Sequence, residues 1–273
     1  MNRLRAHQPA AQAPGAQAGA QEYLIIGGAL GTVVAAGWGY TLYMASAMNH
    51  MDVAGMWMPP MPGGGWSLWD FWMLFSMWAI MMAAMMIPSA IPMVMVYTGL
   101  SRTRRKKGLP YTSVLVFVAG YLLAWMLFSL GISFIQWPMH VAGAMNPMME
   151  SSTYLLSGAV LIAAGIYQWT PYKNACLEKC RSPLGFLLNE WRKGTSGAVV
   201  MGLRHGLYCL GCCWALMLVL FAVGIMNVLW VLLIAGFVLV EKVMPAPKAI
   251  RLVSGAALVL WGGYWVYLHF TIA

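Results

Sequence analysis

The sequence predicts an all-α membrane protein, a polytopic bundle of about seven transmembrane helices. Of the 273 residues, 61% are hydrophobic and only 8% are charged, which does not fit a soluble domain. The charged residues fall in clusters between long apolar runs, as they do in helical proteins that cross the bilayer repeatedly. The net charge of +9 is explained by loops that flank membrane spans, so we expect no binding of nucleic acid.

The chain divides into a short tail and one membrane domain. Residues 1–21 are rich in Ala, Gln and Pro, so we expect a disordered cytoplasmic tail and no signal peptide. Residues 22–273 form the predicted transmembrane helical domain. Its apolar runs are Tyr23–Met44, Trp69–Tyr97, Tyr111–Trp137, Tyr154–Trp169, Gly197–Val223, Val228–Val243 and Ile250–Phe270. The sixth run is short and follows the fifth closely, which predicts a tight helical hairpin.

The positions of Lys and Arg predict the orientation of the bundle. When the loops of a seven-span protein are assigned to alternate sides, all 16 Lys and Arg residues fall on the same side. The positive-inside rule then places the N-terminus in the cytoplasm and the C-terminus in the periplasm, with the protein in the bacterial inner membrane. An even number of spans would divide these charges between the two sides.

The first two outer loops of this topology contain no Lys or Arg but many Met residues. The first carries His50 and Met51 among several other Met residues, and the second carries His140 between Met139 and Met145. Thioether sulfur beside imidazole suits capture of a soft cation in an oxidising compartment, where thiols would be lost. The alternative is that Met is flexible filler in loops that lie on the membrane surface.

The second apolar run carries two rows of Met at helical spacing. Met81 and Met85 lie one turn apart in the first row, and Met82 and Met86 form a second row beside it. These pairs resemble the Met-x-x-x-Met filter of eukaryotic copper-uptake channels, a similarity of one short motif that implies no common fold. We expect the thioethers to guide a metal ion; the alternative is ordinary packing of a membrane helix.

The fifth run begins with one imidazole and three thiols on a single helical face. The spacing of His205, Cys209, Cys212 and Cys213 places all four on the same side of a helix. Such a set suits Cu(I) or Zn(II) and disfavours Mg and Ca, which take oxygen ligands. One helix seldom closes a metal site, so further ligands should come from a neighbouring helix. The alternatives are core packing of small Cys side chains and a strained Cys209–Cys212 redox pair.

The loop before this run holds the remaining thiols. Cys176 and Cys180 can share one helical turn, and nearby Lys and Arg residues favour thiolate. We expect an inner point where metal is handed on; the alternative is a solvated loop with two ordinary thiols. Glu241 and Lys242 end the sixth run, and we expect them to anchor it at the interface. The sequence contains no phosphate-binding Gly-rich loop, so ATP-driven pumping is not expected.

Three segments, taken in order, are similar to one protein family. They are Trp78-x-x-Met81-Met82-x-Ala84-Met85-Met86-x-Pro88, Tyr167-Gln168-x-x-Pro171-x-Lys173-x-x-Cys176-Leu177-x-x-Cys180-Arg181-x-Pro183 and Gly206-x-x-Cys209-x-Gly211-Cys212-Cys213-Trp214. With Met226-Asn227 and Glu241-Lys242, this set resembles the bacterial family of predicted metal-binding integral membrane proteins catalogued as domain of unknown function 2182. The resemblance runs from about Trp69 to Lys248 and implies an integral membrane protein that binds metal.

Together these features predict a membrane protein that binds a soft metal, Cu(I) first and zinc second, and transfers it across the membrane or delivers it within the membrane. The expected partners, besides the lipid bilayer, are other membrane subunits or a periplasmic metal-binding protein. Two alternatives stay open. One is an accessory or assembly subunit of a larger membrane complex, and the other is a membrane thiol–disulfide oxidoreductase. We favour a protein that is not an enzyme.

Overall fold

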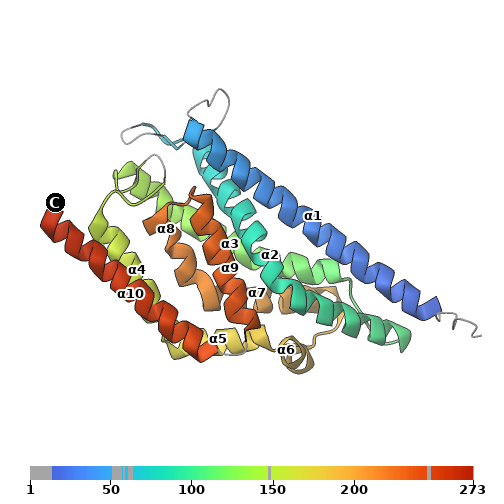
Figure 1. The fold of residues 1–273 in the computed structure, drawn as a ribbon. Helices are drawn as coiled ribbons and strands as arrows, with labels where there is room; N and C mark the ends of the chain where they lie inside the picture. Colours follow the sequence, from blue (N-terminus) through green and yellow to red (C-terminus); the bar gives the residue numbers. More distant parts are fainter. Residues whose placement is uncertain are drawn as a thin grey trace, which may run out of the picture.

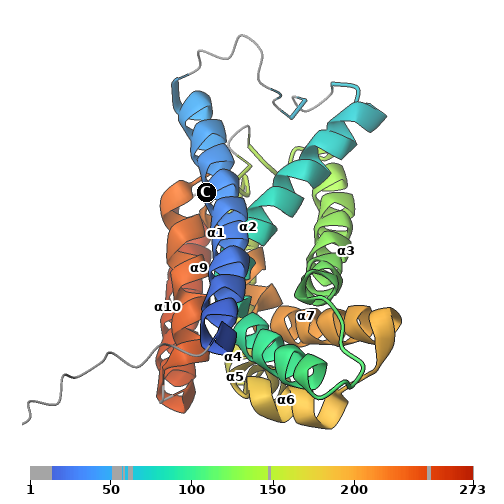
Figure 2. The ribbon, with the colours of Figure 1, turned by 90° about the vertical axis from the view of Figure 1, so that its right-hand side faces the viewer.

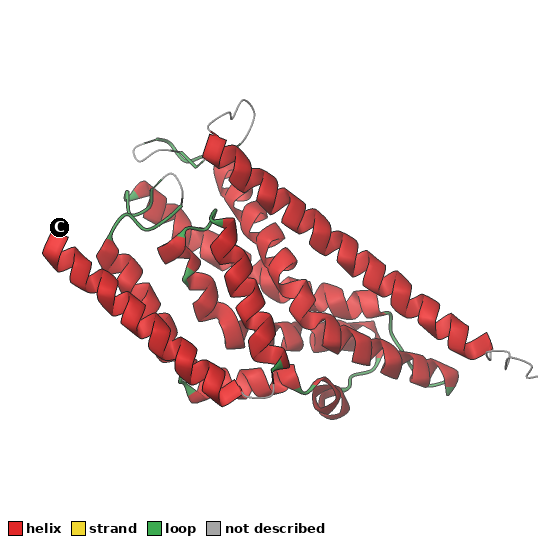
Figure 3. Cartoon of the chain, viewed as in Figure 1, coloured by secondary structure: helices red, strands yellow, loops and turns green. Residues whose placement is uncertain are grey.

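The computed structural model describes residues 14–50, 57, 59–60, 64–146, 149–244 and 247–272. This described part is helical, as the sequence predicts, and contains no strand (Figure 3). Its helices, shown in Figure 1, are α1 (Pro14–His50), α2 (Leu68–Lys106), α3 (Val114–Val141), α4 (Tyr154–Gln168), α5 (Pro171–Arg181), α6 (Pro183–Glu190), α7 (Gly194–Leu218), α8 (Leu220–Val223), α9 (Val228–Val243) and α10 (Pro247–Ile272). Residues 14–21, expected in the tail, lie in the first turns of α1, and residues 1–13 lie outside the described part.

Five helical segments of the described chain are long and apolar enough to cross a membrane. They are Gln21–Ser46, Leu68–Lys106, Val114–Val141, Gly194–Val223 and Lys248–Ile272. The sequence also predicts spans at α4 and α9, but these helices have 15 and 16 residues. At about 1.5 Å per residue they are shorter than a hydrocarbon core of about 30 Å. The helices lie where the sequence predicts them, but a count of seven spans is not confirmed.

The connections between helices gather at two ends of the bundle (Figure 1). One end holds the start of α1, the connection from α2 to α3, helices α5 and α6, and the start of α10. These segments carry the Lys and Arg clusters of the sequence, and we call this end the basic end. The opposite end holds the end of α1, the start of α2, the end of α3, the start of α4 and the end of α10. We call it the Met-rich end, after the composition of the sequence between α1 and α2 and between α3 and α4.

Helices α5 and α6 form at the basic end, where the sequence leaves a solvated loop open as an alternative. Thr170 caps α5 by accepting a hydrogen bond from the backbone N–H of Lys173 at 3.3 Å, and Pro171 occupies its first turn. Pro183 begins α6 in the same position. Helix α5 packs against α7, a helix that begins 13 residues after α5 ends. The connection between α4 and α7 is therefore helical, and its helix α5 packs against the core helix α7.

Helices α3 and α7 pack closely because glycine lies at their contact. A Cβ atom added at Gly120 on α3 would collide with the backbone of Val199 on α7. One added at Gly202 on α7 would collide with the backbone of Phe117 on α3. Small residues allow membrane helices to approach in this way, and α4 and α10 pack through glycines in the same manner.

The outer helices expose apolar side chains, whereas α2 and α7 form the core. Leu24 on α1 and Leu260 on α10 are 75% and 74% exposed, as suits contact with lipid rather than water. Figure 2 shows α1 and α10 on the outside of the bundle. Trp78 on α2 and Cys209 on α7 are fully buried. Eight of the thirteen residues predicted to carry chemistry therefore lie on α2 and α7.

Candidate metal centre

The five cysteines meet at one place in the core, and we call this group the cysteine cluster. Cys209, Cys212 and Cys213 on α7 are buried, and Cys180 on α5 lies next to the sulfur atoms of Cys209 and Cys212. Cys176, one turn earlier on α5, faces Cys212. Helix α5 is therefore the neighbouring helix that brings further thiols to the cysteine face of α7.

Two polar groups from other helices reach the sulfur of Cys209. The ammonium group of Lys242 on α9 lies 3.0 Å from this sulfur and 2.8 Å from the hydroxyl of Ser89 on α2. The hydroxyl of Tyr121 on α3 lies 3.2 Å from the same sulfur and 3.0 Å from the carbonyl oxygen of Met86 on α2. A cation beside a thiol favours the thiolate, the form that binds metal. Cys209 is therefore the chemical centre of the cluster.

A buried ion pair holds α5 against α9 beside the cluster. The ammonium group of Lys173 lies 2.7 Å from a carboxylate oxygen of Glu241, and both side chains are at most 2% exposed. Arg181 donates to the backbone carbonyl of Glu241 at 3.2 Å. The sequence predicts that Glu241 and Lys242 anchor α9 at the interface, and the structure adds that both bond other helices of the protein. Their partners lie on α2, α5 and α7, which the sequence of α9 does not show.

The surroundings of the α5 thiols keep them protonated in the metal-free protein. The sulfur atoms of Cys209 and Cys212, followed by burial, raise the pKa of the Cys180 thiol well above its ordinary value. Burial, and then the nearby Cys212, raise the pKa of the Cys176 thiol. A metal ion bound here would displace these protons, because the thiolate is the ligand.

The cluster offers sulfur ligands without a complete coordination shell. Among the described residues, no three His, Cys, Asp or Glu side chains are arranged to hold an ion together. The thiols of Cys212 and Cys213 donate instead to the carbonyl oxygen of Cys209, at 3.0 and 3.1 Å. Soft thiolate ligands suit copper and zinc.

His205 lies one turn before Cys209 on α7 and is 2% exposed. Its ring packs among the rings of Phe117, Tyr121 and Phe186, with centroids 5.6 to 6.2 Å away. Its Nδ1 atom is buried and has no hydrogen-bond partner. Because a buried polar atom without a partner is costly, this nitrogen fits the predicted ligand role. The aromatic contacts fix the ring beside the cluster.

The Met rows of α2 lie in the same continuous core as the cysteine cluster. Met81, Met82, Met85 and Met86 are each at most 3% exposed. Met93, two turns further along α2, is equally buried but belongs to a separate core cluster. The Met rows and the cysteines thus belong to one buried core. Ligand and packing roles both fit this burial.

The Met-rich end contains one of the predicted outer ligands in a described position. His140 is 4% exposed, and its Nε2 lies 3.1 Å from Nε2 of Gln136. The amide oxygen of Gln136 accepts a hydrogen bond from the indole of Trp78 on α2. His140 is therefore connected to α2 through two side chains. Met51 lies outside the described residues, and so does the side chain of His50, the last residue of α1.

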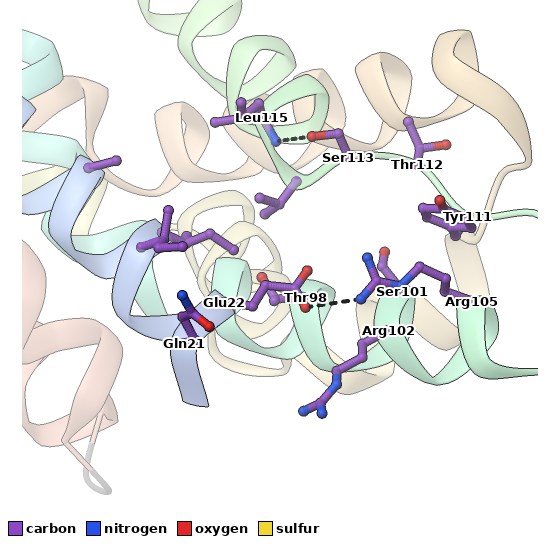
Figure 4. A pocket seen from close by; sticks show the side chains of 14 residues that line it. Gln21, Glu22, Thr98, Ser101, Arg102, Arg105, Tyr111, Thr112, Ser113 and Leu115 are labelled. Atoms are coloured by element: carbon purple, nitrogen blue, oxygen red, sulfur yellow. Dashed lines mark hydrogen bonds and ion pairs between the residues drawn. The ribbon is translucent and has the colours of Figure 1, made fainter. Parts of the chain in front are cut away.

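A cavity of about 600 Å³ lies at the basic end between α1, α2 and the start of α3 (Figure 4). Glu22 and Arg105 form an ion pair across it, with 3.6 Å between their charged atoms. None of the residues that line it is Cys, Met or His. This cavity therefore offers no soft ligands, and the candidate metal centre is the cysteine cluster.

A family model described as "PpoB2: Copper chaperone" matches residues 75–265, most of the chain. The chain belongs to this copper chaperone family. No curated protein and no solved structure matches it. The match supports a copper-related protein and does not confirm the resemblance to domain of unknown function 2182. The matched region of this copper chaperone family member includes the cysteine cluster, the Met rows, His140, His205 and Lys242, whereas His50 and Met51 precede it.

Sequence reasoning missed Lys242, Tyr121 and Ser89 as neighbours of the metal centre. The sequence contained one indication of the role of Lys242, because an ionisable residue beside a long apolar run usually has a function. The sequence contained no such indication for Tyr121 and Ser89, because a hydroxyl group in an apolar helix is common. Their role depends on which side of α3 and α2 faces Cys209.

Proposed function

We propose that this protein is a membrane copper chaperone that binds Cu(I) at the cysteine cluster and passes it to a partner. The observation that carries the proposal is the meeting of Cys180 on α5 with Cys209 and Cys212 on α7. Thiolates from two helices form a soft site of the kind that selects Cu(I). The family match supplies the link to copper independently of these contacts.

The ion would reach the cluster from the Met-rich end along α2. His140 and the outer Met residues would collect it, and Met81, Met82, Met85 and Met86 would guide it. The continuous core that joins these residues to the cysteines supports this path. Thioethers bind Cu(I) without deprotonation, so they suit transfer steps, whereas thiolates suit the holding site.

The basic end would face the cytoplasm, with the protein in the inner membrane. The gathering of the Lys- and Arg-rich segments at one end supports this orientation. The N-terminus would then be cytoplasmic and the C-terminus periplasmic. The receiving partner would be another membrane subunit, or a periplasmic metal-binding protein that exchanges copper at the Met-rich end.

Metal analysis of the purified protein tests the proposal. The detergent-solubilised, reduced protein would be offered Cu(I), Zn(II), Fe(II) and Ni(II) together under anaerobic conditions. We expect copper to be retained in preference to the others. Cys180→Ser and Cys209→Ser should each lower the copper content, while Met93→Leu, a buried substitution outside the cluster, should not. Equal copper content in all four proteins would refute the site.

One observation favours a second candidate, a thiol–disulfide oxidoreductase. Cys180 and Cys209 come from different helices, so a bond between them would avoid the strain of a disulfide within one helix. All five cysteines are free in this structure. Mass spectrometry of alkylated protein, before and after mild oxidation, should detect a Cys180–Cys209 disulfide if this function is correct. A Cys180→Ser variant that keeps the same oxidation pattern would exclude it.

A further inference from the structure

Lys242 places one positive charge against the cysteine cluster. Its ammonium group contacts the sulfur of Cys209 at 3.0 Å and the hydroxyl of Ser89 at 2.8 Å. The neighbouring Glu241 does not neutralise it by contact, because the carboxylate of Glu241 bonds Lys173 at 2.7 Å. The anionic partner that the structure gives to Lys242 is therefore the sulfur.

The charge of the metal ion decides whether the metal–thiolate complex neutralises the positive charge of Lys242. A Cu(I) ion held by two thiolates forms a complex of net charge −1, which the ammonium of Lys242 brings to zero. A divalent ion held by two thiolates is already neutral, and the half-buried ammonium of Lys242 would then have no negative charge at the sulfur. A cation without a counter-charge is costly where water is partly excluded.

A divalent ion could escape this penalty by taking a third thiolate. The described residues contain no set of three His, Cys, Asp or Glu side chains arranged to hold an ion. Cys212 and Cys213 each donate a hydrogen bond to the Cys209 carbonyl, so recruiting either thiol as a third thiolate would break one of these bonds. The structure therefore favours the two-thiolate complex.

We propose that Lys242 is a specificity-determining residue, whose fixed positive charge makes the cysteine cluster select Cu(I) over divalent Zn(II). This inference rests on the proposed copper-binding function and adds the source of its selectivity. Lys242 acts on the ion through charge balance and contacts the sulfur ligand rather than the metal.

Affinity measurements for two metals test the proposal in the full-length protein. Cu(I) and Zn(II) affinities would be measured by competition with chelators for the wild type, Lys242→Leu, Lys242→Gln and Lys242→Arg. We expect Leu and Gln to lower the Cu(I) affinity by about tenfold or more, the loss of one charge-assisted contact, and the Zn(II) affinity to stay equal or rise. Arg should retain the wild-type ratio of the two affinities.

Lys179→Leu provides a matched control, because Lys179 is an exposed lysine that adjoins Cys180 on α5. It should change neither affinity. The Gln variant keeps a hydrogen-bond donor and isolates the charge if the Leu variant does not fold. Equal loss of both affinities, or an unchanged affinity ratio in Leu and Gln, would overturn the role of Lys242 alone. Absence of Cu(I) binding in the wild type would instead overturn the proposed function.

X-ray absorption spectroscopy of the copper-loaded protein supplies a second readout. Two sulfur ligands per copper support the charge balance. Three sulfur ligands in the wild type, of which one is lost in Cys176→Ser, Cys212→Ser or Cys213→Ser, would identify a third thiolate and overturn it, because the complex would then carry a charge of −2.

Discussion

Lys173 on α5 and Glu241 on α9 form an ion pair of 2.7 Å with both side chains at most 2% exposed. They are 68 residues apart in the chain. Through this pair, α5 is fixed beside the helix that carries Lys242, and its two cysteines are fixed beside α7. An ion pair that contains no thiol thus positions two of the five cysteines of the cluster.

Glu241→Gln should destabilise the protein strongly. Removing one partner of a buried ion pair leaves the other charge uncompensated, which typically costs about 3–5 kcal/mol. The thermal unfolding midpoint in detergent should fall, and the copper content should fall with it because α5 loses its attachment. Glu178→Gln, on the exposed side of α5, is the matched control and should change neither. A Glu241→Gln variant as stable as this control would contradict the role of the pair.

Gly202→Ala should disrupt the packing of α3 on α7. The added Cβ would collide with the backbone of Phe117, and overpacking of this kind costs about 1–3 kcal/mol or more. Gly131→Ala on α3 is the control, since its Cβ would meet open space. We expect a lower unfolding midpoint for Gly202→Ala alone. Equal midpoints would show that the two helices separate without cost.

The double variant Met82→Leu/Met86→Leu should separate ligand from packing roles. Leu nearly conserves the volume of Met, so the stability loss should stay below about 1.5 kcal/mol per site, while both thioethers are lost. We expect slower loading of copper from the Met-rich end into liposome-reconstituted protein, with the final copper content unchanged. Met93→Leu, in the separate core cluster, should load at the wild-type rate. Wild-type loading by the double variant would assign these Met residues to packing.

Alkylation should distinguish Cys176 from the other four cysteines. Cys176 is half-buried and the others are buried, so it should react first in the reduced, metal-free protein. Burial and Cys212 raise its pKa, and the thiolate is the reactive form. The rate should therefore be lower than that of a free thiol at neutral pH and should continue to rise at a pH where a free thiol has levelled off. Mass spectrometry after timed labelling measures this order. Simultaneous labelling of all five would show that the cluster is open, and unfolded protein provides that reference.

The sequence predicts more of the fold than of the metal centre. The apolar runs locate the long helices and also α9, whose bounds agree with the prediction, because apolar length is a local property of the chain. The convergence of Cys209, Cys212 and Cys213 on one face of α7 follows in the same way from helical spacing. The runs that become α4 and α9 are already short in the sequence, and the helices do not extend beyond them.

The sequence by itself determined the all-helical class, the soft-ligand composition and the cysteine face of α7. Each depends on residues that are close in the chain. The tertiary structure alone decided that Cys180 meets Cys209, that Lys242 points at that thiol and that Glu241 binds Lys173. These contacts join segments separated by 29 to 68 residues, and they depend on how each helix is rotated against its neighbours. That rotation is set by packing, such as the glycine contact between α3 and α7, which no single segment of the sequence contains.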